Sequence, residues 1–421
     1  MTLVSGNPDC VGLLDDPKDC PAPEATRRVA LDRSVAELSP IVFASLPRAD
    51  QRRKGLMYLR GLLGATGRKS VRNIAAFLKD EVNDQGLHHF INDSTWEWAP
   101  MREALGRHLV HRLPPRAYVV HPLLIPKSGT HSAGVTRTFS WERGQAVTAQ
   151  QVTGVWGVTT NTASPLNWQL HLPPKAASRR IPGSARRATA GGTDPETPEK
   201  SMVNAYLETA ARLALPRRPV VLNAERLDGI KLVSTLAAAG LRHVSKVAGD
   251  TWLLPSDPSL PGWGDDPLQA RRIAQMAKAG RNRVALIPYG PSDTPELVVT
   301  VRVRLPAVRD AWERVPGNGD YLLVAVGRSR AQWPDELWLT DMPTADLSAL
   351  LRLVGLSRQV AHHGVPLAER VGIRDFVGRS YAGWNRHATL ASIAHAATQL
   401  AELRLDSTNM TPGGGWSPHF C

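Results

Sequence analysis

The sequence predicts an α/β protein in which a mixed sheet flanked by helices follows an all-α region. Apolar residues recur at helical spacing from about residue 34 to residue 113. Strand-like apolar runs begin at Ala117, and strands alternate with helices after residue 201. A chain of 421 residues with 42% hydrophobic residues can bury a sizeable core, and its length indicates more than one structural unit.

The charge balance favours a polyanionic partner. Lys and Arg together number 51 against 38 for Asp and Glu, so the formal net charge is +13. Each contact between such a cation and a phosphate releases condensed counterions, which is why basic proteins bind double-stranded DNA. The alternative is a soluble, arginine-rich protein whose charge serves no partner.

Cysteine usage and hydropathy indicate a reducing, bacterial-type cytoplasm. A DNA-binding role places the protein at the nucleoid. The three cysteines are Cys10, Cys20 and Cys421; the first two can be imagined as a pair, but no zinc-binding spacing is present. No run of eighteen apolar residues and no leader pattern occur, so no membrane contact is expected.

Four short amphipathic helices are expected in the helical front. One spans Gln51–Leu63, a second runs from a capping Ser70 to Leu78, and two more follow residues 83–84 and 94–95. Two such helices joined by a polar turn fit a helix-turn-helix unit, although a small bundle with a solvated basic face is the alternative. The candidate DNA-binding residues here are Arg52, Arg53, Lys54, Arg68, Lys69, Arg72, His88 and His89.

Three consecutive strands follow, at Tyr118–Ile125, His131–Phe139 and Ala146–Val158, and their spacing predicts an antiparallel meander. Residues 173–200 are rich in Pro, Gly, Ser and Thr and indicate a mobile basic loop. This loop either follows a phosphate backbone or is a solvated linker. Its candidate DNA-binding residues are Arg179, Arg180, Arg186 and Arg187.

The later elements complete the order of an RNase H-like fold. A helix (201–214), a short buried strand (219–223), a helix (229–239) and a strand (243–247) give the β-α-β part. Further strands between 251 and 343 are interrupted by a helix at 266–279, and helices at 345–356, near 358–371 and at 386–405 close the chain. In this fold, acids on the first strand, after the fourth strand and on a late helix bind two metal ions that cleave phosphodiesters.

The expected organisation therefore has four parts. They are a flexible arm (1–33), a helical DNA-binding-like domain (34–113), an RNase H-like domain (114–405) and a flexible tail (406–421). The third part carries the basic loop at 173–200 and a β-rich insertion near 251–320.

Several segments carry a resemblance to a known family. They are Gln51-Arg-Arg-Lys-Gly-Leu-Met-Tyr-Leu-Arg, Leu87-His-His-Phe-Ile-Asn-Asp-Ser-Thr-Trp, Val119-Val-His-Pro-Leu-Leu-Ile-Pro-Lys-Ser-Gly, Ser132-Ala-Gly-Val and Val377-Gly-Arg-Ser-Tyr-Ala-Gly-Trp-Asn-Arg-His. The chain resembles bacterial insertion-sequence DDE transposases, in particular the actinobacterial group numbered seven hundred and one, over roughly residues 35–405. Residues 160–200 and 255–320 align poorly.

The resemblance implies a degenerate catalytic site. The first catalytic aspartate falls at His121, the second at Glu225 and the late glutamate at Ala361, or at His362 after a one-residue slip. Only Glu225 keeps a carboxylate, and Mg²⁺ requires oxygen ligands. We therefore expect no metal site and no cofactor.

Alternatives to this interpretation stay open. A single-metal site of His121 and Glu225 with His362 or His363 is conceivable, although adjacent helical residues diverge. Asp228 and Glu369 are taken as solvated charges. The leading hypothesis is a domesticated or inactive transposase-like protein that binds double-stranded DNA, and a homodimer is compatible with it. The others are an active transposase with a rearranged Mg²⁺ or Mn²⁺ site and an RNase H-like scaffold with a non-DNA role.

Overall fold

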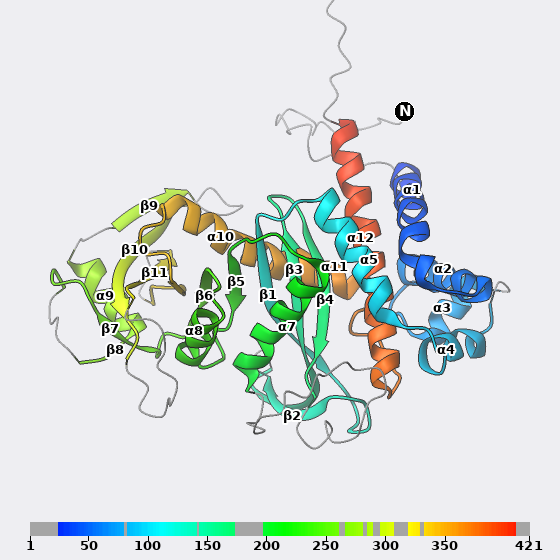
Figure 1. Cartoon of the computed structure of the whole chain (residues 1–421), viewed down its shortest axis with the longest axis horizontal. Helices are drawn as coiled ribbons and strands as arrows, with labels where there is room; N and C mark the ends of the chain where they lie inside the picture. The colour runs from blue at the N-terminus through cyan, green and yellow to red at the C-terminus, as the bar shows by residue number, and fades with distance from the viewer. Residues whose placement is uncertain are drawn as a thin grey trace, which may run out of the picture.

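The computed structural model describes residues 24–79, 82–140, 143–172, 197–260, 266–280, 284–288, 295–306, 319–328 and 332–409. The molecule is elongated, with a helical front at one end, a sheet flanked by helices in the middle and a second β-rich part at the other end (Figure 1). The expected α/β class, with its all-α front, is confirmed. None of the helices in the described ranges is long and apolar enough to span a membrane.

The central sheet has the strand order of the RNase H-like fold. β1 (Ala117–Pro126) pairs antiparallel with β3 (Gln145–Val158), and β3 pairs antiparallel with β4 (Ala163–Leu170). On its other side β1 pairs in parallel with β5 (Val220–Asn223), which pairs in parallel with β6 (His243–Lys246). The order is thus β4-β3-β1-β5-β6.

The expected meander of consecutive strands is wrong in detail. β2 (Val135–Ser140) pairs only with the first part of β3, so β3 lies between β1 and β2. β3 is long enough to hold β2 along its first part and β4 along its second part. β4 was not expected, and it supplies the third strand of the meander instead of β2.

Five helices form the front: α1 (Glu24–Val42), α2 (Ala49–Gly64), α3 (Val71–Leu78), α4 (Asp84–Asn92) and α5 (Trp98–Arg112). The hydroxyl of Ser70 accepts from the Asn73 amide, which confirms the expected cap of α3. The side chain of Asn83 accepts from the Gly86 amide and caps α4 in the same way. The arm was expected to extend to residue 33, but residues 24–33 are helical in α1, and residues 1–23 lie outside the described part.

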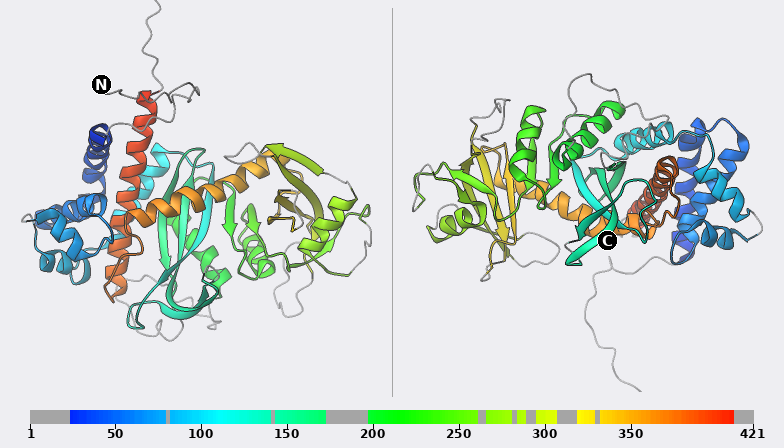
Figure 2. Two further views of the ribbon diagram at one scale, coloured as in Figure 1. Left: turned by 180° about the vertical axis from the view of Figure 1, so that it is seen from behind. Right: turned by 90° about the horizontal axis from the view of Figure 1, so that it is seen from below.

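Helices cover both faces of the central sheet. α7 (Pro198–Leu213) and α8 (Gly229–Ala238) lie on one face, and α10 (Leu347–Gln359) crosses β1, β5 and β6 on the other (Figure 2). Because α7 begins at Pro198, residues 198–200 belong to this helix rather than to the expected basic loop; residues 173–196 are outside the described ranges. A π-helical turn (Val360–Gly364) joins α10 to α11 (Val365–Arg370).

α12 (Tyr381–Asn409) fastens the helical front to the sheet. It contacts α1, α2, α4 and α5 on one side and β4 on the other. The buried guanidinium of Arg386 donates to the carbonyls of Ile91, Asn92 and Trp96, where α4 ends and leaves carbonyls unpaired. The helix continues to Asn409, so the expected tail from residue 406 begins later; the tail beyond it is not described.

The β-rich part extends the same sheet. β12 (Glu336–Thr340) pairs antiparallel with β6, and β11 (Tyr321–Gly327) and β10 (Pro295–Arg304) follow in order. β7 (Trp252–Pro255), β8 (Leu268–Gln269), β9 (Val284–Pro288) and α9 (Ala270–Ala279) complete it. These elements enclose a second hydrophobic core, and β11 carries the β-rich part past residue 320, where the insertion was expected to end.

Candidate functional site

Three side chains form a row across the parallel strands of the central sheet. β1 and β5 are in register from Val120 with Leu222, so His121 lies beside Asn223, and Asn223 is paired with Lys246 at the end of β6. Residues at matched positions of neighbouring strands point to the same face. The row lies under α10, at the edge where an RNase H-like fold gathers its catalytic acids.

Glu225 follows β5 by two residues and reaches the cation of this row. Nζ of Lys246 lies 2.8 Å from Oε2 of Glu225 and 3.7 Å from Oε1 of Glu336, which begins β12. Arg358 of α10 then holds Glu336 at 2.8 Å and Glu296 of β10 at 3.1 Å. We call the alternating series Glu225, Lys246, Glu336, Arg358 and Glu296 the ion chain.

Most side chains of the ion chain are more buried than those of an ordinary surface ion pair. Its members other than Glu225 have side chains no more than 22% exposed, whereas Glu225 is 47% exposed. Burial alone raises the pKa of Glu336, but Arg358 and Lys246 outweigh burial and hold that pKa below its ordinary value. The carboxylate of Glu336 is therefore ionised and is already paired with two protein cations.

His121 is a neutral histidine in this setting. Burial, reinforced by the nearby ammonium of Lys246, lowers its pKa to about 4. Its Nδ1 is buried and has no hydrogen-bond partner within the described part of the chain. The imidazole therefore sits where an aspartate is expected, without the negative charge that a bridging ligand supplies.

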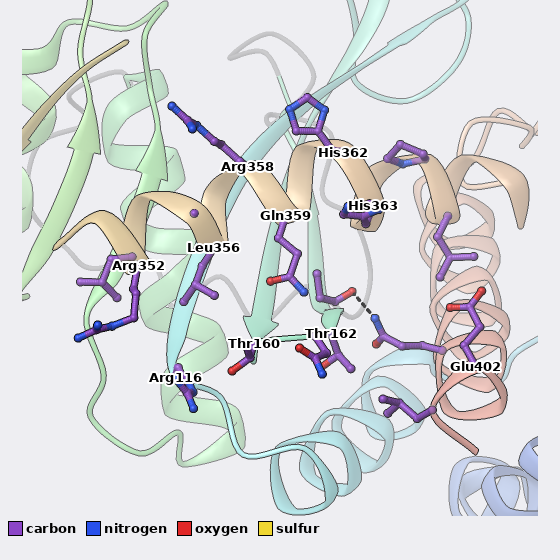
Figure 3. A pocket seen from close by; sticks show the side chains of 18 of the residues that line it. Arg116, Thr160, Thr162, Arg352, Leu356, Arg358, Gln359, His362, His363 and Glu402 are labelled. Atoms are coloured by element: carbon purple, nitrogen blue, oxygen red, sulfur yellow. Dashed lines mark hydrogen bonds between the residues drawn. The ribbon is translucent and has the colours of Figure 1, made fainter. Parts of the chain in front are cut away.

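The position expected for the late glutamate lies in the π-helical turn. This turn packs on β1, so Ala361 lies over the strand that carries His121, but with a methyl side chain. Figure 3 shows Arg358 and His362 projecting from one side of the helix and Leu356, Gln359 and His363 from the other. The two histidines thus diverge, as adjacent helical residues must.

His362 and His363 line a groove of about 1320 Å³ between α10–α11, the β3–β4 turn and the last turns of α12 (Figure 3). The groove opens at Arg116 and Pro219, which precede β1 and β5, and so lies at the opposite end of these strands from Glu225. Neither histidine is joined with His121 and Glu225 in a metal-binding group, and no group of three or more His, Cys, Asp and Glu suited to a metal ion occurs in the described residues.

A two-metal cluster does not fit these residues. A divalent ion at this edge would lie close to the ammonium of Lys246, which already binds Glu225, and would find an imidazole and a methyl group in place of two carboxylates. Like charges in a partly buried site repel strongly. The positive charge that a metal would supply is present in Lys246 and Arg358.

Asp228 and Glu369, the two other acids considered near the expected catalytic positions, have partners within the protein. Asp228 caps α8 by accepting from the amides of Ile230 and Lys231. Glu369 pairs with Arg374 at 2.6 Å. Neither carboxylate is available to replace a missing ligand.

The candidate DNA-binding residues of the helical front lie mostly at the surface. Their side chains are exposed in the short helices and the turn before α3, namely at Arg52, Arg53, Arg68, Arg72, His88 and His89, with Lys54 partly exposed. Arg179, Arg180, Arg186 and Arg187 lie outside the described residues.

Lys69 was expected to be one of the exposed DNA-binding cations, and this expectation is wrong. It is only 8% exposed, and its Nζ donates to the carbonyl of Ala65. Its backbone amide donates to Asp375 at 2.8 Å, and a Cβ at Gly372 would collide with its side chain. Burial lowers the pKa of its ammonium, so Lys69 holds the turn before α3 on the core and is not free to contact DNA.

The ion chain was not found from the sequence. Lys246 ends a strand that the sequence predicts, and parallel strands present their carboxyl ends at one edge. Its place beside Glu225 could therefore have been predicted. Its partners Glu336 and Arg358 come from the β-rich part and from α10, and only the folded arrangement brings them together.

The strand order, the flanking helices and the position of this edge define an RNase H-like nuclease scaffold. The DDE superfamily endonuclease profile matches residues 42–314, more than half of the 421 residues, and the chain belongs to this family. The matched range includes His121 and Glu225 but ends before Ala361. A comparison with curated proteins gives no match.

Proposed function

We propose that this member of the DDE endonuclease superfamily is a transposase-like DNA-binding protein that no longer cleaves DNA. Its relation to the insertion-sequence transposases numbered seven hundred and one rests on the quoted sequence segments. We place it with double-stranded DNA in the bacterial nucleoid, where it acts as a regulator or architectural factor, and a homodimer would suit that role.

One observation carries the proposed loss of cleavage. The ammonium of Lys246 lies between Glu225 and Glu336, at 2.8 and 3.7 Å, in the row that also holds His121. Cleavage by this fold requires carboxylates that bind two divalent ions. Here the one retained carboxylate of the three expected positions is bound to a lysine.

DNA binding is supported by charge and by the arrangement of the front. The chain carries a formal charge of +13, and α3 and α4 are two short packed helices with exposed Arg72, His88 and His89. This pair is compatible with a helix-turn-helix unit, and we infer that residues 34–113 form the DNA-binding part ahead of the RNase H-like part.

The test measures binding and cleavage in the same samples. The full chain is titrated into a random-sequence duplex and into duplexes with the terminal repeats of an insertion element, across a salt series and with Mg²⁺ or Mn²⁺. We expect binding that weakens steeply with salt and no nicking. Metal-dependent nicking that Glu225→Ala abolishes would show an active transposase, and salt-insensitive or absent binding would point to a scaffold with a non-DNA role.

A further inference from the structure

The loop between α11 and α12, residues 371–380, is a junction for segments that lie far apart in the sequence. The backbone amide of Lys69, before α3, donates to Asp375 at 2.8 Å. Nζ of Lys127, after β1, donates to the carbonyl of Phe376 at 2.7 Å. The amide of Ala133, before β2, donates to the carbonyl of Arg379 at 2.9 Å. We call residues 371–380 the junction loop.

The junction loop also touches the end of α4. A Cβ at Gly378 or Gly383 would collide with the side chain of Asn92, the last residue of that helix. The junction thus unites the helical front, the end of β1 and the start of α12. Of the five segments that carry the family resemblance, the four that begin at Leu87, Val119, Ser132 and Val377 have residues at this place.

Each of these parts brings a cation to the junction. Arg68 is exposed on the turn before α3, Arg379 is exposed on the junction loop, and Lys127 is partly buried against the same loop through the carbonyl of Phe376. Arg68 lies close enough to Lys127 to lower its pKa. Within the residues that the structure describes, no side-chain hydrogen bond or ion pair engages the guanidinium of Arg68 or Arg379.

The acid at the junction is already occupied. Asp375 accepts the backbone amide of Lys69 and is partly buried. This carboxylate therefore holds the turn before α3 in place. Unpaired arginines held on short, anchored segments are suited to phosphate groups, which they bind with little loss of side-chain freedom.

We propose that Arg68, Lys127 and Arg379 form a phosphate-binding surface that fixes duplex DNA across the junction between the helical front and the RNase H-like part. This inference rests on the proposed DNA-binding function and names a second contact surface in addition to α3 and α4. The partner is the sugar-phosphate backbone, so the surface contributes affinity and position and does not read base sequence.

The position of this surface relative to the former catalytic edge supports the proposal. His121 lies on β1, and Lys127 follows the last residue of that strand. Six residues of strand span about 20 Å, which is less than one helical turn of duplex DNA at about 34 Å. The row of His121, Asn223 and Lys246 therefore lies within one helical turn of a duplex held at the junction.

The test compares two matched pairs of arginine substitutions. R68A/R379A removes the two exposed cations of the junction and keeps Lys127. R116A/R352A removes two exposed arginines of the groove at the other end of the strands. Dissociation constants for a random-sequence duplex are measured across a salt series, and thermal unfolding checks that each variant is folded. R68K/R379K tests whether charge alone suffices.

We expect R68A/R379A to lower the slope of log affinity against log salt by about 1.8, since each lost phosphate contact removes about 0.9. R116A/R352A should keep the slope of the original protein, and R68K/R379K should keep most of it. An unchanged slope in folded R68A/R379A, while the original protein binds DNA, overturns the junction surface alone. No salt-dependent binding by the original protein overturns the proposed function and this surface together.

Discussion

Nζ of Lys246 lies 2.8 Å from Oε2 of Glu225, at the ends of two neighbouring parallel strands. This pair joins the second expected catalytic position to the ammonium of a lysine. Through Glu336 and Arg358 it also connects the RNase H-like sheet with α10 and with the β-rich part. The ion chain is thus a structural bond between parts of the molecule.

The ion chain predicts a measurable coupling between Lys246 and Glu336. Lys246→Met removes this cation from the partly buried Glu336 and the more exposed Glu225, and we expect a loss of about 1–3 kcal/mol in the free energy of unfolding, below the ~3–5 kcal/mol of fully buried pairs. Glu336→Gln in the same protein should recover part of this loss, because Arg358 otherwise has to balance both Glu336 and Glu296 once Lys246 is gone. Urea unfolding of both single variants and the double variant gives the coupling energy; strictly additive losses would contradict the pairing.

The pairing of Lys246 with Glu225 predicts that restored acids alone do not bind metal at this edge. In H121D/A361E the carboxylate at position 121 still lies near Lys246, so Mn²⁺ should leave the thermal midpoint unchanged. Adding K246A removes the competing ammonium, and Mn²⁺ should then stabilise the triple variant by mass action, at about 2.7 kcal/mol for metal at a hundred times its dissociation constant. Stabilisation of H121D/A361E with Lys246 in place would show that the lysine does not exclude the ion.

The parts of this fold that were predictable are those set by local sequence. Ser70 and Asn83 cap their helices because each polar side chain accepts from the amide three residues ahead. A polar residue before an amphipathic run can be recognised from the sequence alone. The short buried strand expected at 219–223 is β5, which begins one residue later. In contrast, β4 includes Pro165 and Asn167, which are poor strand residues, and it is a strand because β3 provides its hydrogen bonds.

The candidate site was predictable in position and not in chemistry. The resemblance assigned His121 and Glu225, and the parallel pairing of β1 with β5 brings their strands to a common edge. The state of Glu225 depends on Lys246, whose own partners Glu336 and Arg358 lie on elements that the sequence does not place. Lys69 was misassigned for the same reason, since its burial depends on Gly372 and Asp375 at the other end of the chain.

Buried neutral histidines predict a loss of stability in mild acid. Burial lowers the pKa of His387 to about 4 and of His395 to about 3, whereas an unfolded histidine titrates near 6.5. Between pH 6.5 and about 4 the unfolded chain therefore binds more protons than the folded one, so stability falls as pH falls. Each such histidine contributes a slope of up to about 1.4 kcal/mol per pH unit.

His395 offers a direct check of that slope. Its Nδ1 has no partner among the described residues, so His395→Leu removes a titrating group while it leaves one carbonyl, that of Gly364, without its donor. The unfolding free energy of this variant, followed by urea titration from pH 7 to pH 4.5, should fall less steeply than that of the original protein. The exposed His88 serves as the control, because His88→Leu should leave the slope as it was; equal slopes in all three proteins would contradict the burial effect.

Lys127 predicts how DNA affinity changes in mild alkali. Burial and the nearby Arg68 lower the pKa of Lys127 to about 8, partly opposed by Asp375, and its Nζ is fixed on the carbonyl of Phe376. A bound phosphate favours the charged ammonium and raises this pKa, so affinity should be steady below pH 8 and fall above it, by up to about tenfold per pH unit. Fluorescence anisotropy with a labelled random-sequence duplex at constant ionic strength, from pH 7 to pH 9.5, measures this. Lys127→Arg keeps its charge throughout that range and should bind with little pH dependence; the same decline in both proteins would assign the effect to another group.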